Sequence, residues 1–171
     1  MATTQPQFSI RLATRKDSKL VLEFIRDLAR FEELLHKVTT TQRQLQQTLF
    51  HDSPLASVVL GYENKEPAAF AVYFFGFSTF QGGPILCISD LFVPTQHRGK
   101  GYGQALMQHL SKIALDRDCV CVEWGAIKYN TAATGFYERL GAKPVKERLI
   151  YHLNHDTMTT LAQGKLPTQE P

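Results

Sequence analysis

The pattern of apolar and polar positions along the chain predicts alternating helices and strands. Helical spacing of apolar residues, together with start and stop signals, predicts helices at about 14–31, 41–51, 102–116 and 131–140. Shorter stretches that alternate, or are apolar throughout, are typical of strands, and these lie at 8–14, 55–63, 67–77, 85–93, 120–127 and 146–153. A short helix and a polar tail follow. This order predicts one mixed α/β domain over residues 1–171, with a core from about 8 to 155.

Local signals mark several element ends. Thr14 followed by Asp17 resembles a capping box ahead of the first helix. The polar residues 64–66 between two strands indicate a hairpin turn. Gly141 is placed to terminate the helix that begins at Thr131.

Composition and charge narrow the class of protein. The chain has 171 residues, of which 43% are hydrophobic, enough for one well-filled core. Its net charge of +3 is modest and its basic residues are scattered, which does not favour a nucleic-acid surface. The histidines and the three cysteines show no metal-ligand spacing. No signal peptide or apolar run of membrane-spanning length is recognisable, so we expect a cytoplasmic protein without a nucleic-acid, metal or membrane partner.

A glycine-rich stretch, QHRGKGYG at residues 96–103, lies between a predicted strand and a predicted helix. A helix begins with backbone N–H groups that have no partner within the helix, and its dipole makes that end positive. Glycines before it let the backbone come close to a ligand, and His97, Arg98 and Lys100 can add donors. The stretch therefore predicts a cradle for a phosphate group, although an ordinary strand-to-helix turn can look the same.

Two common phosphate-binding motifs do not account for this stretch. The P-loop pattern, GxxxxGK followed by Ser or Thr, is absent. The GxGxxG pattern of dinucleotide-binding folds is also absent, because the glycine after Gly101 comes two positions later, at Gly103, and not three. Glu123 lies about 20 residues further on, where that fold needs a carboxylate, so dinucleotide binding stays open as a weaker alternative.

The stretch from Gln96 to Gly101 resembles the coenzyme A pyrophosphate loop of the GNAT superfamily of N-acetyltransferases. The chain looks most like the spermidine/spermine (diamine) and thialysine acetyltransferase branch. The similar segments are IRLATRKD, LARFEELLHKV, FSTFQGG, ISDLFVPTQHRGKGYG and YNTAATGFYERLGA, in the family's order from residue 9 to about residue 153. The resemblance implies a mixed, mostly antiparallel sheet with splayed central strands flanked by helices. It also implies acetyl-CoA as co-substrate and a homodimer.

The resemblance assigns the coenzyme to a defined set of residues. Backbone groups at the end of the strand at 85–93 would pair with the amides of the pantetheine arm. The loop and the start of the next helix would hold the pyrophosphate, and residues near the start of the helix at 131–140 would flank it. The implied cofactor-binding residues are Leu91, Phe92, Val93, Arg98, Gly99, Lys100, Gly101, Tyr102, Gly103, Gln104, Asn130, Ala133 and Tyr137.

Acyl transfer to an amine needs an acid for the departing thiolate and a neutral attacking amine. Tyr137 matches the family tyrosine that donates a proton to the coenzyme sulfur, and a phenol stays protonated at neutral pH. Diamine acetyltransferases carry a Glu-Asp pair where this chain has Ser89 and Asp90. The glutamate credited with deprotonating the amine is therefore replaced. Asp90, re-aimed by a bulge, or a nearby glutamate remains a candidate base.

Carboxylates that would draw in a cationic amine make up the expected substrate site: Glu32, Asp90 and Glu123, with Ser89 beside them. Because this pocket has fewer acids than that of polyamine enzymes, we expect a smaller amine or the side-chain amine of an amino acid. Two alternatives remain, which are acetylation of a protein lysine or N-terminus, and a non-catalytic module that binds coenzyme A.

Overall fold

The computed structural model describes residues 7–166. The chain forms two compact units, Met1–Asn130 and Thr131–Pro171. Each unit has its own elements, and the expectation of one domain over residues 1–171 stays a prediction.

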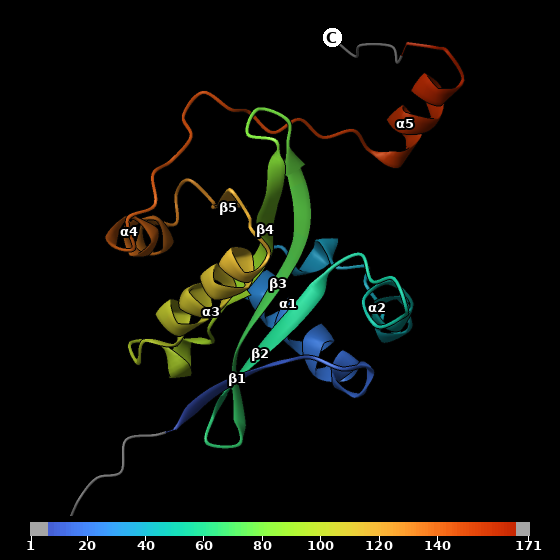
Figure 1. The fold of residues 1–171 in the computed structure, drawn as a ribbon. Coiled ribbons are helices and arrows are strands. Elements are labelled where there is room, and N and C mark those ends of the chain that lie inside the picture. The colour runs from blue at the N-terminus through green and yellow to red at the C-terminus, as the bar shows by residue number, and fades with distance from the viewer. Residues whose placement is uncertain (1–6, 167–171) are drawn as a thin grey trace, which may run out of the picture. The chain divides into compact units, whose positions relative to one another are not determined.

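The first unit is built on a five-stranded mixed sheet in the order β1-β2-β3-β4-β5 (Figure 1). Neighbouring strands pair antiparallel from β1 to β4, and β5 pairs parallel with β4. The strands are β1 (Phe8–Leu12), β2 (Ser57–Glu63), β3 (Glu66–Ser78), β4 (Gly83–Phe92) and β5 (Cys121–Trp124). The mixed, mostly antiparallel sheet that the resemblance implies is confirmed.

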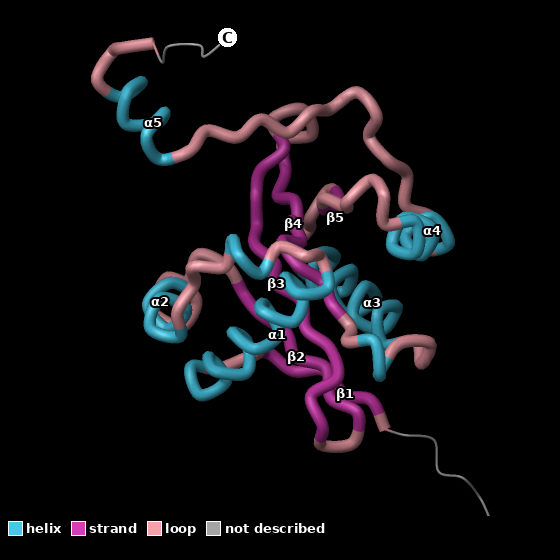
Figure 2. The backbone as a smooth tube through the Cα atoms, turned by 180° about the vertical axis from the view of Figure 1, so that it is seen from behind, coloured by secondary structure: helices cyan, strands magenta, loops and turns pink. Residues whose placement is uncertain are grey.

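Helices cover both faces of this sheet. Seen from opposite sides, α1 lies over one face and α3 over the other (Figures 1 and 2). The helices of this unit are α1 (Ser18–Phe31), α2 (Gln42–Thr48) and α3 (Tyr102–Asp116), with single 3₁₀ turns η1 (Arg15–Asp17), η2 (Leu35–Lys37) and η3 (Thr95–His97). All three α-helices were expected close to these bounds.

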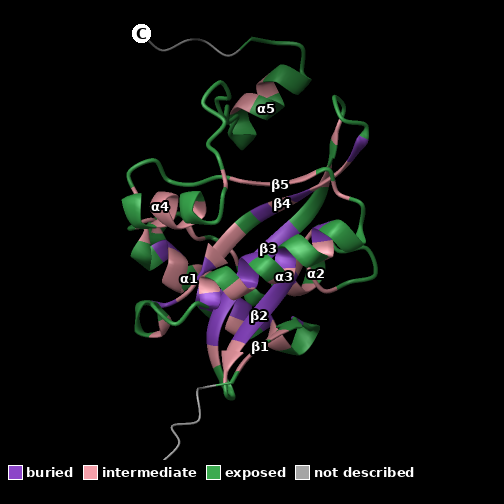
Figure 3. Cartoon of the chain, turned by 60° about the vertical axis from the view of Figure 1, so that its left-hand side comes forward, coloured by how far each residue is buried: buried purple, intermediate pink, exposed green. Residues whose placement is uncertain are grey.

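Burial concentrates along the central strands and the helix faces that cover them (Figure 3). One apolar cluster joins Val21, Leu22 and Phe24 of α1 to inward-facing residues of β2, β3 and β4. Val58, Leu60, Phe70, Val72 and Phe92 are the strand members of this cluster. The cluster thereby identifies which strand residues face α1, since alternate residues of a strand point to opposite faces.

β4 contains one extra residue relative to β3. Val72 pairs with Asp90, but Tyr73 pairs with Ile88, so Ser89 has no partner position on β3. A bulge of this kind breaks the alternation of faces. Because cross-strand partners share a face, Asp90 lies with Val72 on the α1 side, and Ile88 lies with Tyr73 on the other.

The pairing between β4 and β5 stops before β4 ends. It runs from Ile85 opposite Cys121 to Ile88 opposite Trp124, while β4 continues to Phe92. The sequence predicted a longer partner strand, up to residue 127, but β5 ends at Trp124. The two strands therefore separate along residues 89–92, as the resemblance implies.

The second unit contains α4 (Thr131–Arg139) and α5 (His155–Ala162). Gly141 has a φ of +89° and its N–H donates to the Glu138 carbonyl at 2.9 Å, which confirms it as the residue that ends α4.

The predicted strand at 146–153 was wrong, since these residues form neither strand nor helix. Leu149, Ile150 and Tyr151 are exposed. A strand forms only where a neighbour supplies a hydrogen-bonding ladder, and residues 131–166 contain no other strand.

None of the helices in the described part of the chain has the length and apolar character needed to cross a bilayer.

Candidate functional site

The glycine-rich stretch forms an open turn at the start of α3. Gly101 is the N-cap residue of the helix, with a φ of +83°, and Gly99 has a φ of +76°. A Cβ built at either glycine would meet no heavy atom within 4 Å. Both positions need the left-handed backbone conformation that glycine adopts without strain. The turn therefore presents bare backbone and the N-terminus of a helix, the arrangement that binds phosphate. Gly103 and Gln104 lie within the first turn of α3 rather than before it.

The cationic side chains of this stretch have partners within the chain. Arg98 donates from Nε to the Val93 carbonyl at 2.8 Å, and its guanidinium carbon lies 4.2 Å from the centre of the Phe31 ring. Lys100 donates from Nζ to the Glu63 carboxylate at 2.7 and 2.9 Å. The backbone, rather than free cationic side chains, is therefore the part of the turn that is open to a ligand.

Two carboxylates come together at the end of β4 and of α1. Glu32 directly follows α1, and the bulge turns Asp90 toward the same face of the sheet. Burial raises the pKa of Asp90 above its ordinary value, and the neighbouring Glu32 charge raises it further. Burial also raises the pKa of Glu32. A carboxylate with a raised pKa is a better proton acceptor than an ordinary one.

The remaining acids and Ser89 occupy different surroundings. Ser89 is exposed at the bulge. Glu123 lies opposite Cys87 in the β4–β5 pairing, with one carboxylate oxygen 3.9 Å from Cys121 Sγ. The electrostatic neighbour of Asp90 is Glu32, whereas Glu123 acts on the pKa of Cys87. The structure thus brings Glu32 and Asp90 together. Glu123 lies instead beside Cys87, at a part of β4 that precedes the bulge.

The backbone expected to pair with pantetheine lies where β4 has left β5. Leu91 and Phe92 pair with Ala71 and Phe70 of β3 on one side. Their other side has no β5 partner among the described residues, because that ladder ends at Ile88. The Val93 carbonyl, which follows, already accepts the hydrogen bond from Arg98.

The residues expected to flank the coenzyme lie at and after the boundary between the two units. Asn130 ends the first unit, and its N–H donates to the Ile127 carbonyl at 2.9 Å. Ala133 and Tyr137 belong to α4, four positions apart and so on one face of that helix. Burial raises the pKa of Tyr137, whose ring centre lies 5.1 Å from that of Phe136. Their approach to the coenzyme stays a prediction.

Sequence reasoning missed Glu63, the last residue of β2. Its carboxylate accepts from Lys100 and contacts His97 Nδ1 at 2.8 Å. The Lys100 ammonium and then His97 lower the pKa of Glu63 to about 2. Nothing in the sequence connects a strand-end glutamate with a loop 34 residues later.

The sequence matches the acetyltransferase (GNAT) family over residues 22–142. A mouse (Mus musculus) thialysine N-epsilon-acetyltransferase is 27% identical over 173 residues, which cover 95% of this chain and 99% of that protein. The L-ornithine N5-acetyltransferase NATA1 of Arabidopsis thaliana is 25% identical, covering 89% of this chain and 86% of that protein.

The human (Homo sapiens) spermidine/spermine N(1)-acetyltransferase-like protein 1 is 28% identical over 158 residues, 88% of this chain. The match spans only 23% of that longer relative.

Solved structures show the same fold. An integron cassette protein from the mobile metagenome of V. cholerae superposes with a TM-score of 0.76 at 27% identity, covering 91% of this chain and 98% of that one. An aminoglycoside acetyltransferase from an uncultured soil metagenomic sample gives a TM-score of 0.70 at 19% identity, covering 86% and 95%.

Proposed function

Because the chain belongs to the GNAT family of acetyltransferases, which use acetyl-CoA, we propose that it acetylates a primary amine of a small molecule. Transfer is direct, in a complex that holds both substrates. The single observation that carries this proposal is the open turn at Gly99 and Gly101, where backbone N–H groups at the start of α3 can reach a diphosphate.

The residues around the turn fit the coenzyme. The backbone from Gly99 to Gln104 would hold the pyrophosphate, and the unpaired side of Leu91 and Phe92, continuing to Val93, would take the amides of the pantetheine arm. Asn130 and Ala133 would flank it. Bound acetyl-CoA supplies an acetyl thioester as the donor.

The chemistry falls to groups of this chain. Glu32 and Asp90 attract the ammonium form of the acceptor, and Asp90, with its raised pKa, accepts the proton that the amine must lose. Tyr137 donates a proton to the departing thiolate.

The acceptor we propose is the side-chain amine of an amino acid, such as thialysine or ornithine, or a short diamine. Relatives named for thialysine and ornithine acetylation cover most of this chain. Ser89 leaves the site with one acid fewer than the Glu-Asp pair of diamine acetyltransferases, which lowers its attraction for long polycations. We further propose a homodimer, as in the branch that the chain resembles.

An amine panel with thiol release as the readout tests this function. The panel contains thialysine, ornithine, lysine, diamines, spermidine and spermine, with a lysine peptide and a peptide with a free N-terminus beside them. We expect the highest kcat/KM for an amino-acid side-chain amine. Turnover of the peptides alone would favour a protein acetyltransferase. Coenzyme binding without any acceptor would favour a non-catalytic module.

The variant Gly101→Val tests whether coenzyme A binds at the glycine-rich turn. A β-branched side chain is strained at a φ of +83°, and its branches would stand in the open turn. Coenzyme A binding should be abolished, as measured by calorimetry. Binding at the wild-type affinity would remove the turn from the proposal.

A further inference from the structure

We propose that Glu63 is a positioning residue for coenzyme binding, which holds the glycine-rich turn in its open shape from the end of β2. This inference rests on the proposed function, because it assumes that the coenzyme binds at this turn.

The Glu63 carboxylate ties down two points of the turn. Oε2 lies 2.8 Å from His97 Nδ1, and Lys100 Nζ lies 2.7 Å from Oε1 and 2.9 Å from Oε2. His97 and Lys100 stand on either side of Gly99, so one side chain fixes both flanks of the glycine. The Glu63 side chain is only 12% exposed and that of His97 17%. The contact between Glu63 and His97 is therefore partly sheltered from water, whereas the Lys100 side chain is exposed.

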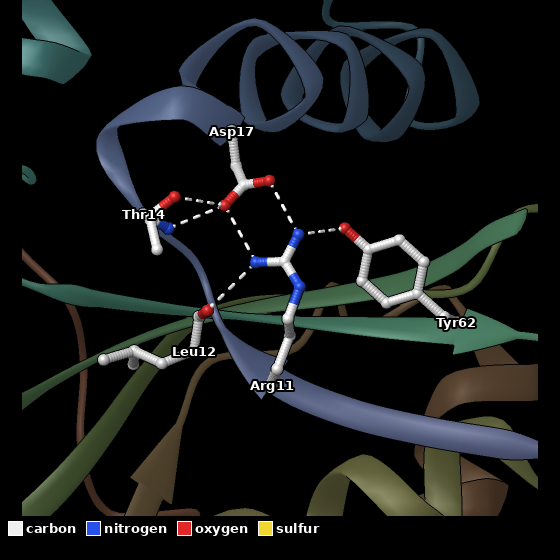
Figure 4. Close-up of polar contacts among 5 residues, drawn as sticks. All are labelled: Arg11, Leu12, Thr14, Asp17 and Tyr62. Atoms are coloured by element: carbon white, nitrogen blue, oxygen red, sulfur yellow. Dashed lines mark hydrogen bonds and ion pairs between the residues drawn. The ribbon is translucent and has the colours of Figure 1, made fainter. Parts of the chain in front are cut away.

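Strand alternation explains why Glu63 faces the turn. Leu60 belongs to the apolar cluster on the α1 face, and Tyr62 packs against that cluster. Gly61 and Glu63 therefore lie on the α3 face. On the α1 side, the Tyr62 hydroxyl contacts Arg11 at 2.6 Å, and Arg11 is held in turn by Asp17 (Figure 4). The last residues of β2 are thus anchored on the face opposite to the turn.

Aromatic stacking brings the start of α3 to the same place. The Phe8 ring stacks on that of Tyr102, with centres 4.0 Å apart and planes within 5°. Phe8 pairs with Glu63 on β2, and the end of its ring reaches over Gly61, where an added Cβ would stand 2.5 Å from Phe8 Cζ. The first residue of α3 is thereby fixed over β1 and β2, next to Glu63.

Tyr102 also relates to the Glu63 carboxylate. Its buried hydroxyl lies toward the Glu63 carboxylate, although no contact it makes among the described residues has full hydrogen-bond geometry. Burial, and then the Glu63 carboxylate, raise the pKa of Tyr102. Glu63 is therefore an acidic group shared by the turn and the start of α3.

The gain in coenzyme binding from a fixed turn should outweigh the loss that comes from neutralising the Lys100 charge. A turn with two left-handed glycines loses much conformational entropy when it is ordered, and a preformed turn spares the ligand that cost. A Lys100 released from Glu63 would be a flexible, solvated cation, whose attraction for phosphate is weak at an exposed site. Removal of the carboxylate should therefore weaken coenzyme binding, although it uncovers a positive charge.

The test compares Glu63→Gln with Glu66→Gln, a change of the same kind at an exposed residue three positions further along the same hairpin. For Glu63→Gln we expect the Kd of coenzyme A and the KM of acetyl-CoA to rise about tenfold. Turnover at saturating acetyl-CoA and the KM of the amine should stay within about twofold, since neither depends on the turn once the coenzyme is bound. Glu66→Gln should match the wild type in each measurement.

A second pair of variants isolates the contact and covers the case in which Glu63→Gln folds poorly. The double variant Glu63→Gln/Lys100→Gln should weaken binding no more than Glu63→Gln alone, because the first change already breaks the contact with Lys100. Lys100→Gln alone should weaken binding less, since it keeps the contact between Glu63 and His97. Additive losses would show that the two side chains act separately and would overturn the proposal.

Three further outcomes would overturn the proposed role of Glu63. Equal or tighter binding by Glu63→Gln would mean that Glu63 only masks Lys100. A lower melting temperature with an unchanged Kd would reduce Glu63 to a structural role. A wild-type protein that binds no coenzyme A would overturn the proposed function and this inference together, whereas wild-type binding with an unaffected Glu63→Gln variant overturns this inference alone.

Discussion

Asp90 shows how one extra residue in a strand changes the chemistry of a side chain. Without an insertion, Asp90 would share the face of Ile88 and Leu86, which is not the α1 face. The insertion places it on the α1 side, where burial and Glu32 raise its pKa. An aspartate in water would be a weak base for an alkylamine, and this environment makes it a stronger one.

The pH dependence of turnover tests this role. Asp90 acts as a base only when ionised, so at saturating amine the rate should fall as the pH drops through the pKa of Asp90, which lies above the usual 3.8. Asp90→Asn should lower kcat by about 10²- to 10⁴-fold.

Glu32→Gln removes the charge that helps to raise the pKa of Asp90 and should shift the acid limb to lower pH. Glu33→Gln, at the exposed next residue, should leave the limb in place. An acid limb that does not respond to Glu32→Gln would separate the two carboxylates.

Tyr137→Phe tests the proposed acid. Coenzyme A binding should persist, while kcat falls by about 10²- to 10⁴-fold, the usual cost of a lost acid catalyst. Burial raises the pKa of Tyr137, so in the wild type the alkaline loss of rate should lie at a higher pH than the ordinary phenol pKa of 10.0 would give. An unchanged rate in the variant would exclude Tyr137 from proton transfer.

At the scale of elements, the entry to α1 depends on a polar network. Asp17 accepts from the Thr14 N–H at 2.7 Å and from its hydroxyl at 2.8 Å, which confirms the expected capping box. Arg11 forks onto the two carboxylate oxygens at 2.8 and 2.7 Å (Figure 4). The network joins β1 to the helix that carries Glu32 at its other end.

Asp17→Asn should lower the free energy of unfolding by about 1–2 kcal/mol at pH 7, the range for a lost cap and a partly exposed charged hydrogen bond. The Arg11 guanidinium holds the pKa of Asp17 well below its usual range. Its contribution is therefore complete above pH 3.8 and lost as the pH falls through the lower folded-state pKa. Urea unfolding at pH 7 and at pH 2–3 should show a smaller acid loss in the variant than in the wild type. Asp52→Asn, at an exposed position, is the control.

For the molecule as a whole, the sequence predicted what depends on local patterns. The bounds of α1 and α3, the hairpin at residues 64–66 and the glycine turn all follow from spacing and from residues with special backbone preferences. Asn64 takes a φ of +58° there, as asparagine does readily.

What the sequence could not give depends on partners far along the chain. The segment 146–153 has the composition of a strand but no strand to pair with among residues 131–166. Glu63 meets the turn only because its side chain points to the face of the sheet that α3 covers. To predict on which face of the sheet Asp90 lies, one needs the register of β3 against β4, and no spacing within β4 reveals it.

Ser89 carries a consequence for how such enzymes diverge. It is the residue that the ladder skips, and its side chain is exposed. No core contact constrains it, so mutations there should be tolerated by the fold, and the acid found at this position in diamine acetyltransferases can come and go with little cost in stability. We propose that acceptor preference can thus change at a position where folding exerts almost no selection.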